Sequence, residues 1–101
     1  IIFDGGSTTV STNITVSNTL TMVNTSAPRT LTMPDITTST VGKIFYIKDA
    51  TGNAGTNNIT INDSVSGHSI DGDTFIVLES DFAAVTLVST SGSSGFDYVV
   101  V

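Results

Sequence analysis

Apolar and polar residues alternate along most of this chain with a period of two, and no stretch shows the period of an amphipathic helix. In the clearest segments a single threonine stands between two apolar residues. These segments are Ile14–Val16, Leu20–Met22, Leu31–Met33, Ile59–Ile61 and Val85–Leu87. The pattern is typical of half-buried strands whose apolar residues face a core and whose threonines face solvent.

Turn-forming residues separate the alternating segments at short intervals, as in Asp4-Gly5-Gly6, Pro34-Asp35, Thr51-Gly52-Asn53 and Asp71-Gly72. We therefore predict strands at 1–3, 13–17, 19–23, 29–33, 42–49, 57–62, 73–79, 83–89 and 96–101. Many short strands in one small chain indicate an all-β fold. We expect an antiparallel sandwich or a jelly-roll-like domain.

Three runs break the alternation because they are apolar at consecutive positions: Ile44–Ile47, Phe75–Leu78 and Tyr98–Val101. A strand with two apolar faces needs cover on both sides. One face uses the core of its own domain, and in so small a chain we expect another subunit to cover the second. We therefore predict a homo-oligomer, and the alternative is a thick sandwich that covers both faces within one chain. Lys43 and Lys48 bracket the first run, where charges of this kind discourage pairing at sheet edges.

The chain has 101 residues, a length suited to one domain. Residues 1–26 carry Thr, Ser or Asn at most outward positions, and we interpret them as a stalk-like segment or strand pair that leads into a sandwich at 27–101. Because the chain starts at Ile1 without a signal peptide or an apolar run near membrane length, we expect it to be part of a longer protein.

The composition excludes several classes of function. The net charge is −6, and Arg29, Lys43 and Lys48 are the only basic residues apart from one histidine. Nucleic acids and anionic membrane surfaces require clustered Lys and Arg, so we predict neither as a partner. Cysteine is absent, which excludes disulfides and thiolate chemistry. Low charge, at 12% of residues, together with abundant Ser and Thr, suits an exposed extracellular or virion-surface domain.

Candidate chemistry is sparse. His68 precedes Asp71 and Asp73 and could act with them as an acid–base pair, but we prefer a solvated loop histidine. The same two aspartates, with Asp63, could offer oxygen ligands to calcium, although we prefer a tight hairpin turn at Asp71-Gly72. No Gly-x-Ser-x-Gly pattern is present. We therefore predict no enzyme activity, no catalytic residue, no resident metal and no cofactor.

The loop tips are the remaining binding candidates. The loop at 49–57 contains Asn53 and Asn57, whose amides could hydrogen-bond a sugar beside an aromatic ring such as Tyr46 or Tyr98. The competing interpretation is that these loops are plain solvated turns. Asn53, Asn57, His68, Asp71 and Asp73 are thus weak candidates for a receptor-binding site.

The segment 42–61, Gly-Lys-Ile-Phe-Tyr-Ile-Lys-Asp-Ala-Thr-Gly-Asn-Ala-Gly-Thr-Asn-Asn-Ile-Thr-Ile, resembles a pattern common in virus and bacteriophage fibre, tail-fibre and tailspike proteins. Leu31–Pro34, Ile70–Gly72 and Val85–Val88 continue the resemblance, which covers residues 29–101. A tryptophan is frequent near the last strand of such proteins, whereas Phe96 and Tyr98 stand there in this chain.

The resemblance implies a homotrimeric fibre head on a virion surface that attaches the particle to a host receptor or glycan. It fixes no binding residue. Two other classes stay open: a purely structural capsid or fibre element, and a carbohydrate-binding or adhesin module of a cell-surface protein.

Overall fold

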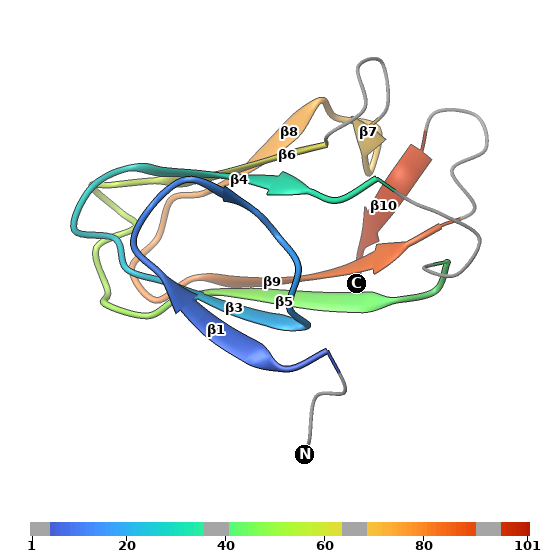
Figure 1. The fold of residues 1–101 in the computed structure, drawn as a ribbon. Coiled ribbons are helices and arrows are strands. Elements are labelled where there is room, and N and C mark those ends of the chain that lie inside the picture. The colour runs from blue at the N-terminus through green and yellow to red at the C-terminus, as the bar shows by residue number, and fades with distance from the viewer. Residues whose placement is uncertain (1–4, 36–40, 64–68, 91–95) are drawn as a thin grey trace.

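The structure, a computed structural model, describes residues 5–35, 41–63, 69–90 and 96–101. Within these residues the chain is all-β, as predicted, and its strands form two layers (Figure 1). The strands are β1 Ser7–Val10, β2 Ile14–Thr15, β3 Leu20–Val23, β4 Arg29–Met33, β5 Ile44–Asp49, β6 Ile59–Asp63, β7 Ser69–Ile70, β8 Phe75–Leu78, β9 Ala84–Ser89 and β10 Phe96–Val100. In the described residues there is no helix of the length and apolarity needed to cross a membrane.

One sheet has six strands in the order β1-β3-β5-β9-β10-β7, and the other has four in the order β2-β4-β6-β8. The first six strands alternate between the two sheets, so the chain coils and each strand lies beside the strand two places earlier. Strands β1, β3 and β5 therefore run parallel, and so do β2, β4 and β6. This arrangement of two facing sheets is compatible with a β-sandwich.

The expectation of antiparallel pairing is wrong for this first half of the chain. A coiled path brings every second strand to one sheet in the same direction, whereas a jelly roll is built from antiparallel Greek keys. Antiparallel pairing is found later, where β9 pairs with β5 and β10, and β8 pairs with β6. β5 lies between β3 and β9, so Lys43 and Lys48 do not protect a sheet edge as we had expected.

The core lies between the two sheets, and period-two alternation places it there. Leu31 and Met33 of β4 and Ile59 and Ile61 of β6 are fully buried, as predicted. The other buried apolar residues are Val16, Val23, Phe45, Ile47, Ala54, Ile70, Leu87 and Tyr98. The Phe45 and Tyr98 rings meet edge to face, with centroids 6.0 Å apart and an interplanar angle of 70°.

β3 has the opposite orientation to the one we predicted. Thr21 and Val23 face the core and are fully buried, whereas Leu20 and Met22 are half-buried on the outer side. The register explains this, because Thr21 lies opposite the inward Ile47, and Leu20 lies opposite the outward Tyr46. The Thr21 hydroxyl is buried without a hydrogen-bond partner among the described residues.

Most predicted strand positions are confirmed within a few residues, and two strands were missed. β1 has the weakly apolar sequence Ser-Thr-Thr-Val, and β7 has two residues, so neither gave a clear alternation. The strand predicted at 1–3 lies outside the described residues. Residues of the predicted stalk-like segment 1–26 contribute β1, β2 and β3 to both sheets, and the proposed boundary near residue 27 stays a prediction.

Candidate functional site

Three loops meet at one end of the two sheets around the buried carboxylate of Asp49, the last residue of β5. Its Oδ1 accepts hydrogen bonds from the Thr25 hydroxyl at 2.8 Å and from the N–H groups of Thr51 and Gly52 at 3.1 and 3.0 Å. Its Oδ2 accepts the N–H groups of Ala54 and Phe82 at 3.0 and 2.9 Å. We call this arrangement the loop junction.

The loop junction keeps Asp49 ionised. Burial raises the pKa of the carboxyl group, but the hydrogen bonds from Ala54, Phe82 and the remaining donors lower it by more. The net pKa therefore lies well below its ordinary value. A carboxylate whose oxygens are already occupied in this way anchors loops and does not act as an acid, a base or a metal ligand.

Phe82 is held over the loop junction in a left-handed backbone conformation, with φ at 60°. Its ring packs on Gly52, where an added Cβ would lie 2.4 Å from the ring. The Lys48 ammonium donates to the Phe82 carbonyl at 2.5 Å and lies 5.1 Å from the ring centroid. Phe82 as a whole is nevertheless 60% exposed, so it presents an apolar residue to solvent at this end of the molecule.

The predicted loop residues Asn53 and Asn57 both contribute to this same end. The Asn53 N–H donates to the Thr25 hydroxyl at 3.0 Å, and its carbonyl accepts the Asn57 N–H at 2.8 Å. The Asn57 side-chain amide donates to the Thr25 carbonyl at 2.8 Å. The Asn57 amide is therefore occupied in joining two loops, whereas the Asn53 residue is exposed.

The predicted candidates Asp71 and Asp73 belong to a tight turn between β7 and β8. Asp71 and Gly72 both have positive φ, at 53° and 88°, and Ile70 and Asp73 exchange backbone hydrogen bonds at 2.8 and 2.9 Å. This geometry matches the hairpin turn that we preferred for the Asp-Gly pair. Across the described ranges, no three His, Cys, Asp or Glu side chains gather in a way that could hold a metal. His68 lies outside the described residues.

The two tyrosines proposed to stack on a sugar beside the loops lie in different surroundings. Tyr98 is only 1% exposed, and its hydroxyl donates to the Pro34 carbonyl at 2.5 Å. Burial and the nearby Asp63 and Asp97 carboxylates raise the pKa of Tyr98 above its ordinary value. Tyr46 is half-buried on the outer side of the six-stranded sheet, away from the core. Among the aromatic residues whose exposure the structure describes, the strongly exposed ones are instead Phe75 and Phe82.

The outer side of the six-stranded sheet carries many apolar residues, and we call it the outer apolar face. The register aligns Leu20 with Tyr46 across β3 and β5, and Ile44 with Val88 across β5 and β9. The apolar residues of this face are Leu20, Met22, Ile44, Tyr46, Ala84, Val88 and Val99, and the register places Lys48 and Thr86 among them. The described strands form only two layers, so none of them covers it.

A hollow of about 350 Å³ with almost entirely apolar walls opens on this face. Its lining residues are Leu20, Met22, Tyr46, Ile47, Lys48, Ala84, Val85 and Thr86. The Lys48 ammonium is directed to the carbonyls of Asp49 and Phe82, so its charge lies toward the loop junction. Ile44 remains 41% exposed. The prediction that the run Ile44–Ile47 carries apolar side chains on both faces is thus confirmed.

The outer side of the four-stranded sheet consists mainly of threonines and carries no charged residue in its two rows, and we call it the threonine face. Thr15, Thr32, Asn62 and Phe75 lie directly opposite one another across β2, β4, β6 and β8. Thr30, Thr60 and Val77 form a second row beside them.

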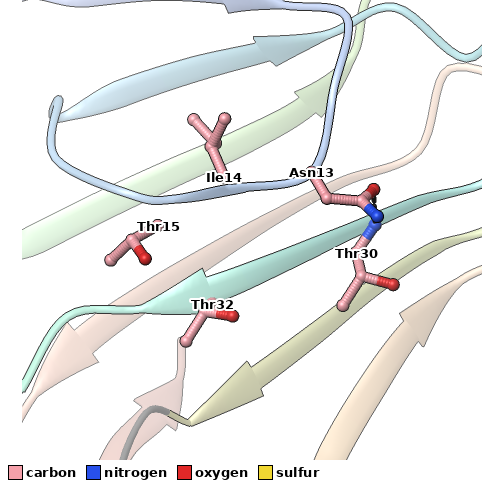
Figure 2. A pocket seen from close by; sticks show the side chains of 5 residues that line it. All are labelled: Asn13, Ile14, Thr15, Thr30 and Thr32. Carbon is pink, nitrogen blue, oxygen red and sulfur yellow. Dashed lines mark hydrogen bonds between the residues drawn. The ribbon is translucent and has the colours of Figure 1, made fainter.

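An open hollow of about 320 Å³ lies at the β2 end of the threonine face, lined by Asn13, Ile14, Thr15, Thr30 and Thr32. Figure 2 shows the side chains of the three threonines on one side of the backbone and Ile14 pointing to the other. The Asn13 Oδ1 accepts the Thr30 N–H at 2.8 Å, which extends the short β2 ladder by one bond.

The threonine face was not predicted as a site, and on the outer apolar face only the runs Ile44–Ile47 and Tyr98–Val101 were predicted to meet another subunit. Period-two alternation shows which residues of one strand share a side, but it does not show which strands lie next to each other. Leu20 and Met22 were placed in the core for the same reason. No protein-family model matches the chain, and no curated protein matches it at a significant level.

Proposed function

We propose that the chain forms the head of a homotrimeric viral or bacteriophage fibre that attaches the particle to a host surface. The outer apolar face carries this proposal. Leu20 and Met22 lie on the outside of β3, while Thr21 occupies the core with a hydroxyl that has no hydrogen-bond partner among the described residues. A lone chain gains nothing from this orientation, whereas a subunit whose outer side packs on a second copy buries both apolar residues.

The number of copies and the attachment role come from the resemblance of segment 42–61 to fibre proteins. Trimerisation also suits attachment physically, because three weak contacts to a surface together give useful avidity. The loop junction supports the role as well, since Asp49 fixes three loops at one end and leaves the Phe82 ring exposed there.

The first test is the oligomeric state. We expect light scattering coupled to size-exclusion chromatography to give the mass of three chains at micromolar concentration. Met22→Asp places a charge in the outer apolar face and should give a folded monomer. Ser11→Asp adds the same charge at an exposed loop position and should leave the trimer intact. A wild-type monomer would overturn the proposal.

The second test is attachment. The labelled trimer is applied to a printed glycan array and to panels of intact microbial and eukaryotic cells. Binding that Met22→Asp weakens supports an attachment head, because loss of the trimer removes avidity. A stable trimer that binds neither glycans nor cells would overturn the attachment role and favour a purely structural fibre element.

A further inference from the structure

The threonine face contains a straight row of side chains that crosses all four strands of the smaller sheet. Thr15 lies opposite Thr32, Thr32 opposite Asn62, and Asn62 opposite Phe75. Neighbouring strands lie about 4.8 Å apart, so the row is roughly 14 Å long. A row of this length is comparable with a short oligosaccharide.

The polar groups of this row are available to a ligand. Within the described part of the chain, no hydrogen bond joins the side chains of Thr15, Thr32 or Asn62 to another protein group. Hydroxyls both donate and accept hydrogen bonds, and an amide adds a separate donor and acceptor. The row therefore offers both kinds of partner at regular spacing, on a sheet whose backbone is fixed by its ladders.

The two ends of the row differ in a way that suits a sugar chain. At the β8 end the residue Phe75 is 51% exposed. At the β2 end, the open hollow of about 320 Å³ lies beside Thr15 and Thr32 (Figure 2). An exposed ring can stack on the C–H face of a sugar ring, while the hydroxyls and the amide bond the sugar's own hydroxyl groups.

We propose that this row binds a neutral oligosaccharide. The inference rests on the proposed function, because it supplies the glycan contact of the attachment head. Neither row of the threonine face contains a charged residue, so a sialylated or sulfated glycan would find no counter-charge there.

A second copy of the chain is a poor occupant for the same face. Packing it against another protein surface would remove water from the hydroxyls and the amide, and each buried group left unpaired is costly. The outer apolar face on the opposite sheet offers copies a surface with fewer such groups. Each subunit would thus use one sheet for assembly and the other for the ligand.

The test uses the intact wild-type oligomer on an array of neutral oligosaccharides and their sialylated and sulfated counterparts. We expect neutral glycans to bind, and we expect sialic acid or sulfate groups at the contact not to increase the affinity. Phe75→Ala removes the stacking ring and should weaken binding by roughly tenfold. Thr32→Val keeps the shape but removes a central hydroxyl, and a loss of severalfold is expected. Thr56→Val changes an exposed threonine in a distant loop and should bind as wild type.

Light scattering on each variant separates the alternatives. Weaker binding by Phe75→Ala and Thr32→Val at an unchanged oligomer mass supports the glycan row. Dissociation of the oligomer by Phe75→Ala would overturn it and make this face a subunit interface. Glycan binding that survives both substitutions would also overturn it, yet leave the attachment role intact. Binding to cells without binding to any glycan would likewise overturn the glycan row and leave the attachment role intact. A trimer that binds neither cells nor glycans would overturn both the glycan row and the attachment role.

Discussion

At the scale of single residues, Asp49 shows how a buried charge organises loops. Hydrogen bonds to a charged acceptor contribute more than neutral ones, and here the donors come from three loops. The sequence pointed to the loop at 49–57 as a possible binding surface. It did not indicate that the first residue of that loop is its anchor, because the partners Thr25 and Phe82 lie 24 and 33 positions away.

Asp49→Asn should be strongly destabilising. The substitution replaces a carboxylate oxygen with an NH₂ group that must face N–H donors, so at least one buried hydrogen bond to a charged acceptor is lost. We expect the free energy of unfolding to fall by about 3 kcal/mol at pH 7. Urea titration followed by circular dichroism measures it. Asp71→Asn, at an exposed turn position with positive φ that Asn also tolerates, should change stability little.

The same carboxylate predicts a pH dependence. The folded pKa of Asp49 lies below the value of about 3.9 expected in the unfolded chain, so the unfolded state takes up a proton first as the pH falls. Its stabilising effect is therefore complete above about pH 5 and is lost progressively below pH 4. Urea midpoints between pH 7 and pH 2 should fall less steeply for Asp49→Asn than for wild type or Asp71→Asn. Equal slopes in all three proteins would contradict this role.

Substitution of Thr21 should increase the stability of the fold. Its hydroxyl is buried without a hydrogen-bond partner among the described residues, and valine has nearly the same shape. Thr21→Val should raise the free energy of unfolding by about 1 kcal/mol, because the cost of an unsatisfied hydroxyl disappears. Thr8 lies directly opposite on β1 but is partly exposed, so Thr8→Val should give a much smaller gain. Denaturant midpoints at an unchanged m-value test the difference, and a destabilised Thr21→Val would show that the hydroxyl is satisfied.

At the scale of elements, the sequence predicted strand positions better than strand neighbours. Leu31–Met33 and Ile59–Ile61 were assigned correctly because their threonines face solvent and both flanking residues are buried. The identical pattern at Leu20–Met22 led to a wrong prediction, because in the observed register Leu20 and Met22 face outward and Thr21 faces the core. Alternation reports two different sides of a strand, and only the neighbouring strands decide which side is the core.

The relative direction of neighbouring strands could not be predicted from the sequence either. We expected antiparallel pairing, but consecutive strands from β1 to β9 cross to the opposite sheet, and the first six strands form parallel pairs. The turn at Asp71-Gly72 was predictable because its chemistry is local, with positive φ at both positions. The rows of side chains on the two outer sides could not be predicted, because each row depends on the register of three or four strands at once.

Contact between loops gives a prediction at this scale. Gly52 has φ at 82°, and an added Cβ would lie 2.4 Å from the Phe82 ring. Gly42 has nearly the same φ, at 81°, with nothing within 4 Å of its added Cβ. Gly42→Ala should therefore cost only backbone strain, about 1 kcal/mol, whereas Gly52→Ala should cost roughly 2–3 kcal/mol because Phe82 must move as well. Equal losses in thermal or urea unfolding would mean that the ring yields freely.

At the scale of the whole molecule, the two outer sides have opposite character. One carries Leu20, Met22 and Tyr46, and the other carries Thr15, Thr32 and Asn62. The mean hydropathy is +0.29, which agrees with the small number of charged residues, and the net charge is −6. Composition indicated excess apolar surface, but the structure was needed to place Leu20, Met22 and Tyr46 together on one side of one sheet.

That asymmetry predicts how stability depends on concentration and salt. If copies associate through the outer apolar face, folding is coupled to assembly, and the melting temperature should rise as the protein is concentrated. Because each chain carries a net charge of −6, association brings like charges together, and raising the salt from about 0.05 to 0.5 M should stabilise the assembly by screening them. Met22→Asp should melt at a lower temperature that no longer depends on concentration. Calorimetry over a hundredfold dilution series measures both effects, and a wild-type melting temperature that is constant across the series would contradict assembly through this face.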